Sequence, residues 1–183
     1  ITLQPTPTPI HPDLPTYPFQ GTHHWLNTPT TGDPQTFGLR PVVHPLLGAA
    51  IHRADEEGVV FTGRVSAATH PWLADHVVRG SVLFPGTAFV EAAIRAGDEV
   101  GAPCLEELVL EAPLVVTAQQ TVSLQVTVGA PDASGRRAVS VHSAPQSGAE
   151  STADPLWSRH AHGFLVPDLP DDMVSGYFAE VFD

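Results

Sequence analysis

The clearest pattern along the chain is an alternation of polar and apolar residues in its second half. Residues 121–128 read Thr-Val-Ser-Leu-Gln-Val-Thr-Val, with an apolar side chain at every second position. Residues 138–142 repeat the alternation after a turn-forming segment, 132–135. Because successive side chains of a strand point to opposite faces, this pattern predicts half-buried antiparallel strands.

Further strand signals lie on both sides of this pair. β-branched residues between polar breaks predict strands within 42–51 and 59–65, and the last strand is expected over 157–166. Cys104 is expected near the start of another strand. Residues 145–155 are polar and rich in Ser, Gly and Glu, which is typical of a loop. The sequence thus predicts about six strands, largely antiparallel.

One segment has the pattern of a buried helix. Residues 86–96 are mostly helix formers, and among them Thr87, Glu91 and Arg95 are the polar side chains. Pro85 favours the first helical turn, since its missing N–H would have no partner there. A helix that is apolar on nearly every side must be covered nearly all round. A long buried helix wrapped by an antiparallel sheet makes an α+β domain with the hotdog architecture.

Composition narrows the class of protein. The chain has 183 residues, 42% of them hydrophobic, which suffices for one domain with a substantial core. No window approaches the 18 or so consecutive apolar residues of a membrane span, and the N-terminus lacks a secretory pattern. The single Cys104 excludes an internal disulfide. We therefore expect a cytoplasmic protein.

The charge balance is strongly acidic. The net charge is −12, and all eight basic residues are Arg. This argues against a nucleic-acid partner, because neutralising phosphates requires a basic face. An acidic protein partner would need a local arginine patch. The candidates are Arg53, Arg64, Arg79, Arg95 and the pair Arg136–Arg137.

The ends of the chain differ in composition from its middle. Residues 1–38 are rich in Pro and Thr without sustained periodicity, which predicts an extended linker. Residues 39–168 carry the strand and helix patterns and form the expected domain. Residues 169–183 are expected to begin a further linker.

His76 is the most promising chemical group. It lies in a predicted strand end shortly before the buried helix, and a histidine can move a proton near neutral pH. The N-terminus of a helix offers free N–H groups and a positive dipole end, suited to an oxygen that gains negative charge. Together these parts could remove a proton next to a carbonyl and hold the resulting enolate.

A family resemblance supports this interpretation. His76, Gly80 and Pro85 match the HxxxGxxxxP motif of dehydratase domains from modular type I polyketide synthases. Four further segments resemble those domains in the expected order: the first strand at 44–48, the approach to the histidine at 70–76, the start of the central helix at 84–91 and the late strand at 157–163. Residues 17–20 and 25–26 resemble the linker that arrives from a preceding acyltransferase domain.

The resemblance implies the N-terminal hotdog of a double-hotdog dehydratase. Its reaction would remove water from a β-hydroxyacyl thioester and give an α,β-unsaturated thioester. His76 would be the general base, and the backbone N–H of Gly80 would donate to the thioester carbonyl. Pro85 would have a structural role, while Val82 and Phe84 are candidates for lining an acyl tunnel.

The resemblance also implies partners. The substrate would be carried on the phosphopantetheine arm of an acyl carrier protein, so that no cofactor is expected. Adjacent polyketide synthase domains, a second hotdog half and a homodimer are the other expected partners. The catalytic acid would be an Asp beyond Asp183, in the second half. If extended, Asp75 would face away from the substrate of His76, and Asp98 lies near the far end of the helix.

Two other functions remain open. The chain could be a non-catalytic scaffold or dimerisation module with a dehydratase-like fold. The same fold and histidine could also migrate a double bond or close a ring.

No metal is expected: His160 and His162 would share a strand face, but no carboxylate or thiolate stands at ligand spacing. His44 and His70 each precede a proline, which makes a structural role the simpler one, and His23 and His24 lie in the linker.

Overall fold

The computed structural model describes residues 33–117, 120–146 and 155–168. The chain divides into two units, residues 1–32 and residues 33–183, and the described residues all belong to the second. Most of the predicted linker, with His23 and His24, lies outside the described residues, and so do residues 169–183. Residues 34–37 at the end of the predicted linker form a short 3-10 helix, η1 (Pro34–Phe37), which Asp33 caps through a hydrogen bond to the Gln35 N–H.

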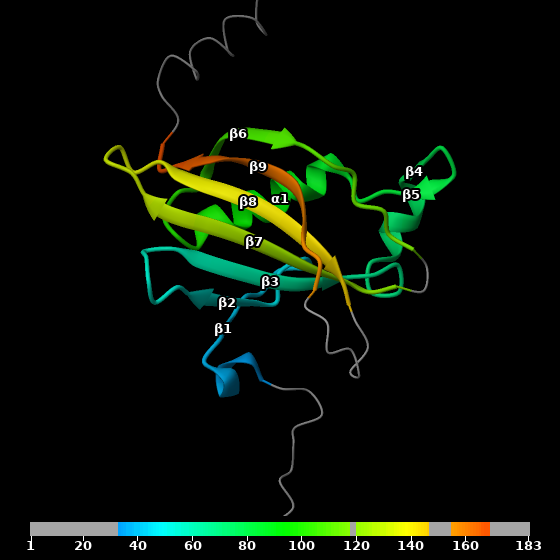
Figure 1. Ribbon diagram of the computed structural model, residues 1–183, viewed down its shortest axis with the longest axis horizontal. Helices are drawn as coiled ribbons and strands as arrows, with labels where there is room; N and C mark the ends of the chain where they lie inside the picture. Colours follow the sequence, from blue (N-terminus) through cyan, green and yellow to red (C-terminus); the bar gives the residue numbers. More distant parts are fainter. Residues whose placement is uncertain (1–32, 118–119, 147–154, 169–183) are drawn as a thin grey trace, which may run out of the picture. The chain divides into compact units, whose positions relative to one another are not determined.

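The main element is a seven-stranded sheet in which every neighbouring pair is antiparallel (Figure 1). Its spatial order is β1-β2-β3-β7-β8-β9-β6, so that β9, the last strand among the described residues, lies between β8 and β6. The strands are β1 (Arg40–Pro41), β2 (Ala49–His52), β3 (Val59–Val65), β6 (Cys104–Leu110), β7 (Val122–Pro131), β8 (Arg137–Pro145) and β9 (Ser158–Val166).

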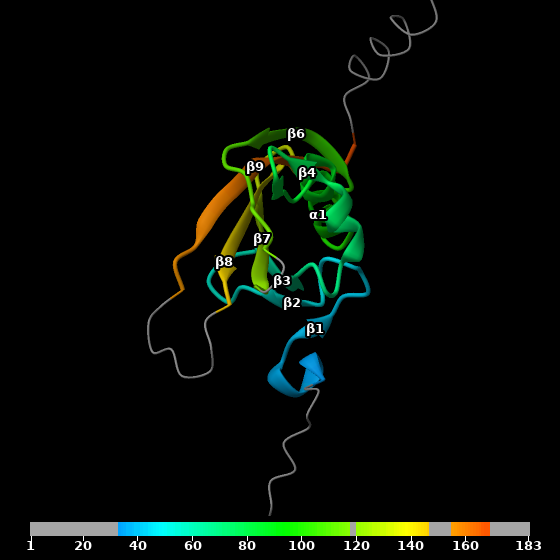
Figure 2. The ribbon, with the colours of Figure 1, turned by 90° about the vertical axis from the view of Figure 1, so that its right-hand side faces the viewer.

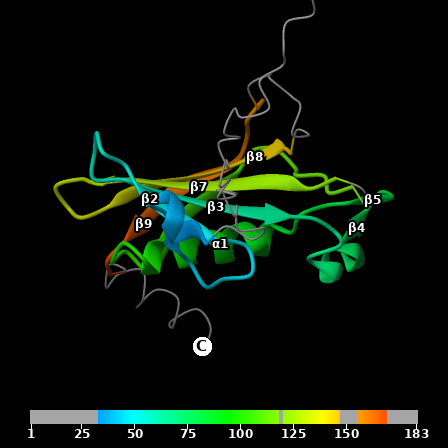
Figure 3. The same cartoon turned by 90° about the horizontal axis from the view of Figure 1, so that it is seen from below.

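The helix α1 (Gly86–Asp98) packs on one face of this sheet, which curves around it (Figures 2 and 3). Ala92, Ala93 and Ala96 are fully buried, because small side chains let the helix approach the strands closely. Strand β7 contributes every second residue from Val122 to Val128 to the core, as the pattern of 121–128 predicts. An antiparallel sheet wrapped around one helix is the predicted hotdog architecture.

Details of the prediction are wrong in three places. The helix is not covered on nearly every side, since Val90 and Ile94 are only half-buried. Residues 42–48 form a connection instead of a strand, and β2 begins only at Ala49. The helix begins at Gly86, so that Pro85 is its N-cap residue rather than its first turn.

The segment before His76 also differs from the prediction. Residues 71–75 form the 3-10 helix η2 (Pro71–Asp75), not a strand that ends at His76. A proline at the first position of η2 has no N–H to satisfy, which favours a helical turn there. Two very short strands, β4 (Val77–Val78) and β5 (Ser81–Val82), follow as a hairpin that the sequence pattern did not reveal.

The connection 44–48 passes directly over Gly63 of β3. A Cβ atom at Gly63 would overlap the backbone carbonyl of Leu46, so a side chain cannot be accommodated unless the connection moves. Gly48 lies in the same region, but a Cβ there would meet only the Thr62 carbonyl oxygen, at 4.0 Å.

We predict that Gly63→Ala lowers the free energy of unfolding by about 1–3 kcal/mol, because overpacking displaces the backbone of the connection. Gly48→Ala is the matched control and should leave stability within about 1 kcal/mol of the wild type, since its backbone conformation suits alanine. Urea denaturation of both variants measures the difference. Equal stability of the two variants would contradict the close approach at Gly63.

Candidate active site

His76 lies between the 3-10 helix η2 and the β4–β5 hairpin. Its backbone N–H donates to the Leu73 carbonyl at 3.0 Å, which closes η2. Its carbonyl accepts from the Leu83 N–H at 3.1 Å, at the other end of the hairpin. Arg79 and Gly80 form the tip with positive φ angles of 51° and 81°, as a two-residue hairpin turn requires. The hairpin therefore returns the chain to His76 just before the helix begins.

A second hydrogen bond orients the His76 ring. Its Nδ1 atom lies 2.9 Å from the carbonyl oxygen of Leu83. A carbonyl can only accept, so the ring hydrogen of this bond is on Nδ1. In the neutral ring Nε2 then carries a lone pair and can accept a proton. The backbone of Leu83 thus holds His76 in the tautomer that a general base needs.

A cavity of about 320 Å³ opens beside His76. One wall comes from the start of α1, where Gly86 and Phe89 face it. The opposite wall is the chain that follows β6. The lining residues are His76, Leu83, Phe84, Gly86, Phe89, Leu110, Glu111, Ala112 and Pro113. A proton acceptor and a helix N-terminus therefore share one largely apolar cavity.

Glu111 is the carboxylate that lines this cavity. The Arg159 guanidinium donates two hydrogen bonds to it, of 2.7 and 2.8 Å, and His162 Nδ1 lies 3.0 Å from the same carboxylate. The hydrogen bonds from Arg159 lower the pKa of the Glu111 carboxyl, and the charges of Arg159 and His162 act in the same direction. Glu111 therefore stays ionised near neutral pH and is a poor proton donor.

Comparison with known proteins identifies the family of this chain. Residues 44–144, more than half of the chain, match the family model of the polyketide synthase dehydratase domain. The chain belongs to this family. The match covers the whole segment from the connection at His44 through the His76 hairpin and α1 to β8.

Curated relatives of this dehydratase chain are large polyketide synthases. Polyketide synthase GfsA of Streptomyces halstedii is 55% identical over 160 residues, which are 86% of this chain and 2% of that protein. The pikromycin polyketide synthase component PikAII of Streptomyces venezuelae is 49% identical over 166 residues, 90% of this chain and 4% of that protein. The chain therefore spans only a small part of these relatives.

Solved dehydratase structures have the same fold. The dehydratase domain from the terminal module of the rifamycin polyketide synthase aligns with a TM-score of 0.68 and 50% identity. The erythromycin dehydratase aligns with a TM-score of 0.69 and 46% identity. The alignments cover 75% of this chain and 48% and 50% of those two chains, so the dehydratase chain spans about half of each.

The structure brings together some of the residues predicted for the site of this dehydratase chain. Phe84 lines the cavity, and Pro85 sets the start of α1 beside it. Val82 packs against the core instead of lining the cavity. Gly80 lies exposed at the hairpin tip, also away from the cavity lining, and its predicted contact with a thioester stays a prediction.

The two aspartates considered as acids lie away from the cavity. Asp75 belongs to η2 and is exposed, so the extended backbone assumed for it is wrong, although it does not line the cavity of His76. Asp98 is the last residue of α1, about 18 Å along the helix from Gly86. Glu111 and Phe89 were not predicted as site residues, because their place in the cavity of His76 depends on how β6 and α1 pack.

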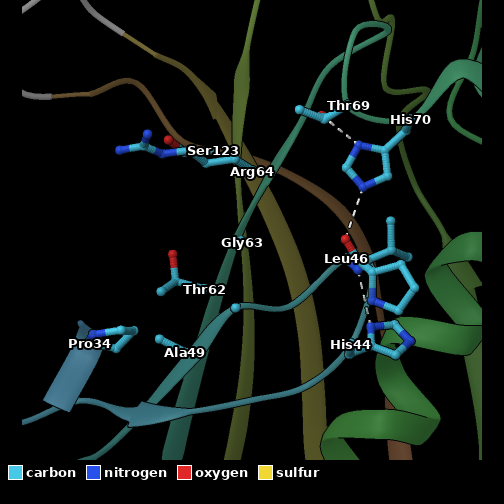
Figure 4. Close-up of a pocket in the computed structure, with 12 residues that line it drawn as sticks. Pro34, His44, Leu46, Ala49, Thr62, Gly63, Arg64, Thr69, His70 and Ser123 are labelled. Atoms are coloured by element: carbon cyan, nitrogen blue, oxygen red, sulfur yellow. Dashed lines mark hydrogen bonds between the residues drawn. The ribbon is translucent and has the colours of Figure 1, made fainter. Parts of the chain in front are cut away.

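His44 and His70 border a second, larger cavity of about 660 Å³, whose lining shares no residue with the first (Figure 4). His70 is buried and bridges the Thr69 hydroxyl, at 2.8 Å, and the Pro45 carbonyl, at 2.9 Å. His44 Nδ1 accepts from the Leu46 N–H at 3.2 Å. Both rings hold the connection 44–48 in place, which accounts for them structurally.

His160 and His162 do not form the shared pair expected from their spacing. His160 is buried and hydrogen-bonded to Ser143, whereas the side chain of His162 is 41% exposed and lies beside Glu111. An irregularity in the β8–β9 pairing at His160 breaks the simple alternation along the strand. Within residues 33–117, 120–146 and 155–168, no group of three His, Cys, Asp or Glu side chains is placed to hold a metal ion.

The arginines are mostly paired within the described part of the chain. Arg53, Arg95, Arg136 and Arg137, which were candidates for a docking patch, each form an ion pair with a carboxylate. Among the residues the structure describes, Arg64 and Arg79 form no ion pair with a carboxylate.

No helix among the described residues is long and apolar enough to cross a membrane.

We predict that Arg159→Gln raises the pKa of Glu111 toward its ordinary value, because the hydrogen bonds that favour the ionised form are lost. The wild-type pair stabilises the fold above the unfolded pKa of Glu111, and this contribution disappears as pH falls through the lower folded pKa. Carboxyl ¹³C NMR titration gives the pKa directly. Arg137→Gln, which removes a pair with Glu57 elsewhere, should leave Glu111 unchanged.

Proposed function

We propose that this chain is the first half of an enzyme that dehydrates a β-hydroxyacyl thioester carried by an acyl carrier protein. The product is an α,β-unsaturated acyl thioester. The observation that carries the proposal is His76, whose Nδ1 is engaged by the Leu83 carbonyl, facing a cavity that also contains the start of α1. Membership in the dehydratase family supports this reaction.

The base in this proposal is Nε2 of His76. It takes the proton from the α-carbon, and the electron pair moves toward the thioester carbonyl, whose oxygen gains negative charge. The first N–H groups of a helix have no intrahelical partner and point toward such an oxygen. Gly86, the first residue of α1, lines the cavity and is the best placed to donate. The electron pair then expels the β-hydroxyl as water.

The departing hydroxyl needs a proton from an acid, because hydroxide is a poor leaving group. Glu111, the carboxylate of the cavity, does not suit this role, since its bonds to Arg159 keep its pKa low. We propose that an Asp in a second hotdog half supplies the proton, as the resemblance implies. The proposal is supported by the length of the solved dehydratases, since this chain covers only about half of each.

The partners in this proposal follow from the substrate. The acyl chain arrives on the phosphopantetheine arm of a carrier protein, and the reaction itself needs no further cofactor. Arg79 is the arginine nearest in sequence to His76 and lies exposed at the tip of the hairpin. It is therefore the arginine that we propose for contact with the acidic carrier protein. The neighbouring polyketide synthase domains and a homodimer complete the assembly we propose.

We predict that His76→Ala lowers dehydration by about 10²–10⁴-fold in the complete domain, because removal of a general base has this cost. His52→Ala is the matched control, since His52 is exposed on β2 and does not line the cavity. Mass spectrometry of a β-hydroxyacyl carrier protein before and after incubation measures turnover. Near-normal dehydration by His76→Ala would eliminate His76 as the base. A shifted double bond or a ring in the product would instead support isomerisation or cyclisation.

A further prediction concerns the acid. Residues 1–183 expressed alone should not dehydrate the substrate and should be poorly soluble, because apolar surface that the second half covers is exposed. Leu110, half-exposed at 54% beside the cavity, is one such residue. Size-exclusion chromatography and the same mass-spectrometric assay compare this chain with the complete domain. A soluble and fully active short chain would overturn the two-half mechanism.

A further inference from the structure

His160 occupies an irregular position in β9. Its neighbours Arg159 and Ala161 pair with His142 and Val141, which are adjacent in β8, so His160 is an extra residue in the ladder. Such a bulge re-aims a side chain that regular alternation would send elsewhere. His160 is only 4% exposed and belongs to no part of the mechanism above.

The ring of His160 contacts both walls of the His76 cavity. It stacks on Phe89 of α1, with ring centroids 5.9 Å apart and an angle of 17° between the planes. Its Nδ1 donates to the Ala112 carbonyl at 2.9 Å, and its own backbone carbonyl accepts from the Glu111 N–H at 2.8 Å. Phe89 forms the first wall, and Glu111 with Ala112 forms the second.

A third contact fixes the ring from behind. Nε2 of His160 lies 2.7 Å from the hydroxyl of Ser143, on β8. Because the Ala112 carbonyl takes the hydrogen on Nδ1, the Ser143 hydroxyl donates to Nε2 of the neutral ring. Both ring nitrogens are thereby satisfied, so the ring has one preferred orientation. Phe89 also packs edge-to-face on Phe84, with ring centroids 4.8 Å apart, so the aromatic contact continues to a second residue that lines the cavity.

We propose that His160 is a positioning residue that sets the separation between the two walls of the cavity, and so determines which acyl chains fit beside His76. The inference rests on the proposed dehydration. His160 does not line the cavity and does not touch the reacting atoms. Its ring acts through Phe89 on one side and through the Ala112 carbonyl on the other.

Two substitutions separate the two contacts. His160→Phe keeps an aromatic ring against Phe89 but leaves the Ala112 carbonyl and the Ser143 hydroxyl without their hydrogen-bond partner. His160→Asn keeps an amide N–H near the position of Nδ1 but loses the stacking on Phe89. His52→Phe is the matched control, because His52 is exposed on β2 and does not line the cavity.

The experiment uses the complete dehydratase domain with two carrier-bound substrates, β-hydroxybutyryl and β-hydroxyoctanoyl. The readout is the ratio of their kcat/KM values, which does not depend on the fraction of protein that is folded. We expect each His160 variant to change this ratio by about tenfold, mainly through KM of the longer substrate, since one misfitting group in an apolar pocket has an effect of this size. His52→Phe should leave the ratio unchanged.

The outcomes distinguish this inference from the function on which it rests. If the wild-type domain dehydrates neither substrate, the proposed function fails. If the wild type is active and both folded His160 variants keep the kcat/KM ratio within about twofold of the wild-type ratio, the positioning role is wrong. A displaced cavity wall would change the ratio by more than that. If neither variant folds, His160 serves the fold alone, and the proposal is overturned in that case too. One folded variant with a changed ratio and an unchanged pH profile supports it.

Discussion

The packing of α1 against the concave face of the sheet is the contact on which the rest of the structure depends. Ala92, Ala93 and Ala96 are completely buried there, and the small side chains allow the helix axis to lie close to the strands. Four strands, β6 to β9, contact the helix. Because this contact fixes where α1 begins, it also fixes the place of the cavity at the helix N-terminus.

The chemistry proposed for His76 depends on one backbone carbonyl. Leu83 engages Nδ1 of the ring, and the tight turn at Arg79 and Gly80 brings Leu83 back to that position. A short hairpin thus presents a histidine in a defined tautomer immediately before a helix. The turn requires a positive φ angle at Gly80, four positions after His76, and Pro85, nine positions after His76, caps the start of α1.

The electrostatics of the cavity favour a base and disfavour an acid. Arg159 holds the Glu111 carboxylate ionised, so that the cavity contains a proton acceptor at His76 but no neutral carboxyl group at Glu111. An elimination of water needs both. In the proposed mechanism His76 therefore supplies the base, and the acid is a group other than Glu111.

The sequence by itself determined the class of fold, and it predicted His76 as the main chemical group. Alternation in 121–128 predicted β7, the alanine-rich segment after Pro85 predicted α1, and the spacing of His76, Gly80 and Pro85 predicted the family. These are local patterns, since period and motif spacing are properties of neighbouring residues. Tertiary structure alone decided which distant residues meet: the pairing of β9 with β6 and β8 brings Arg159 to Glu111 and His160 to Phe89, although these partners are 48 and 71 positions apart in the chain. Contacts between strands and helices depend on how the chain crosses over, and no periodicity within a single segment records that.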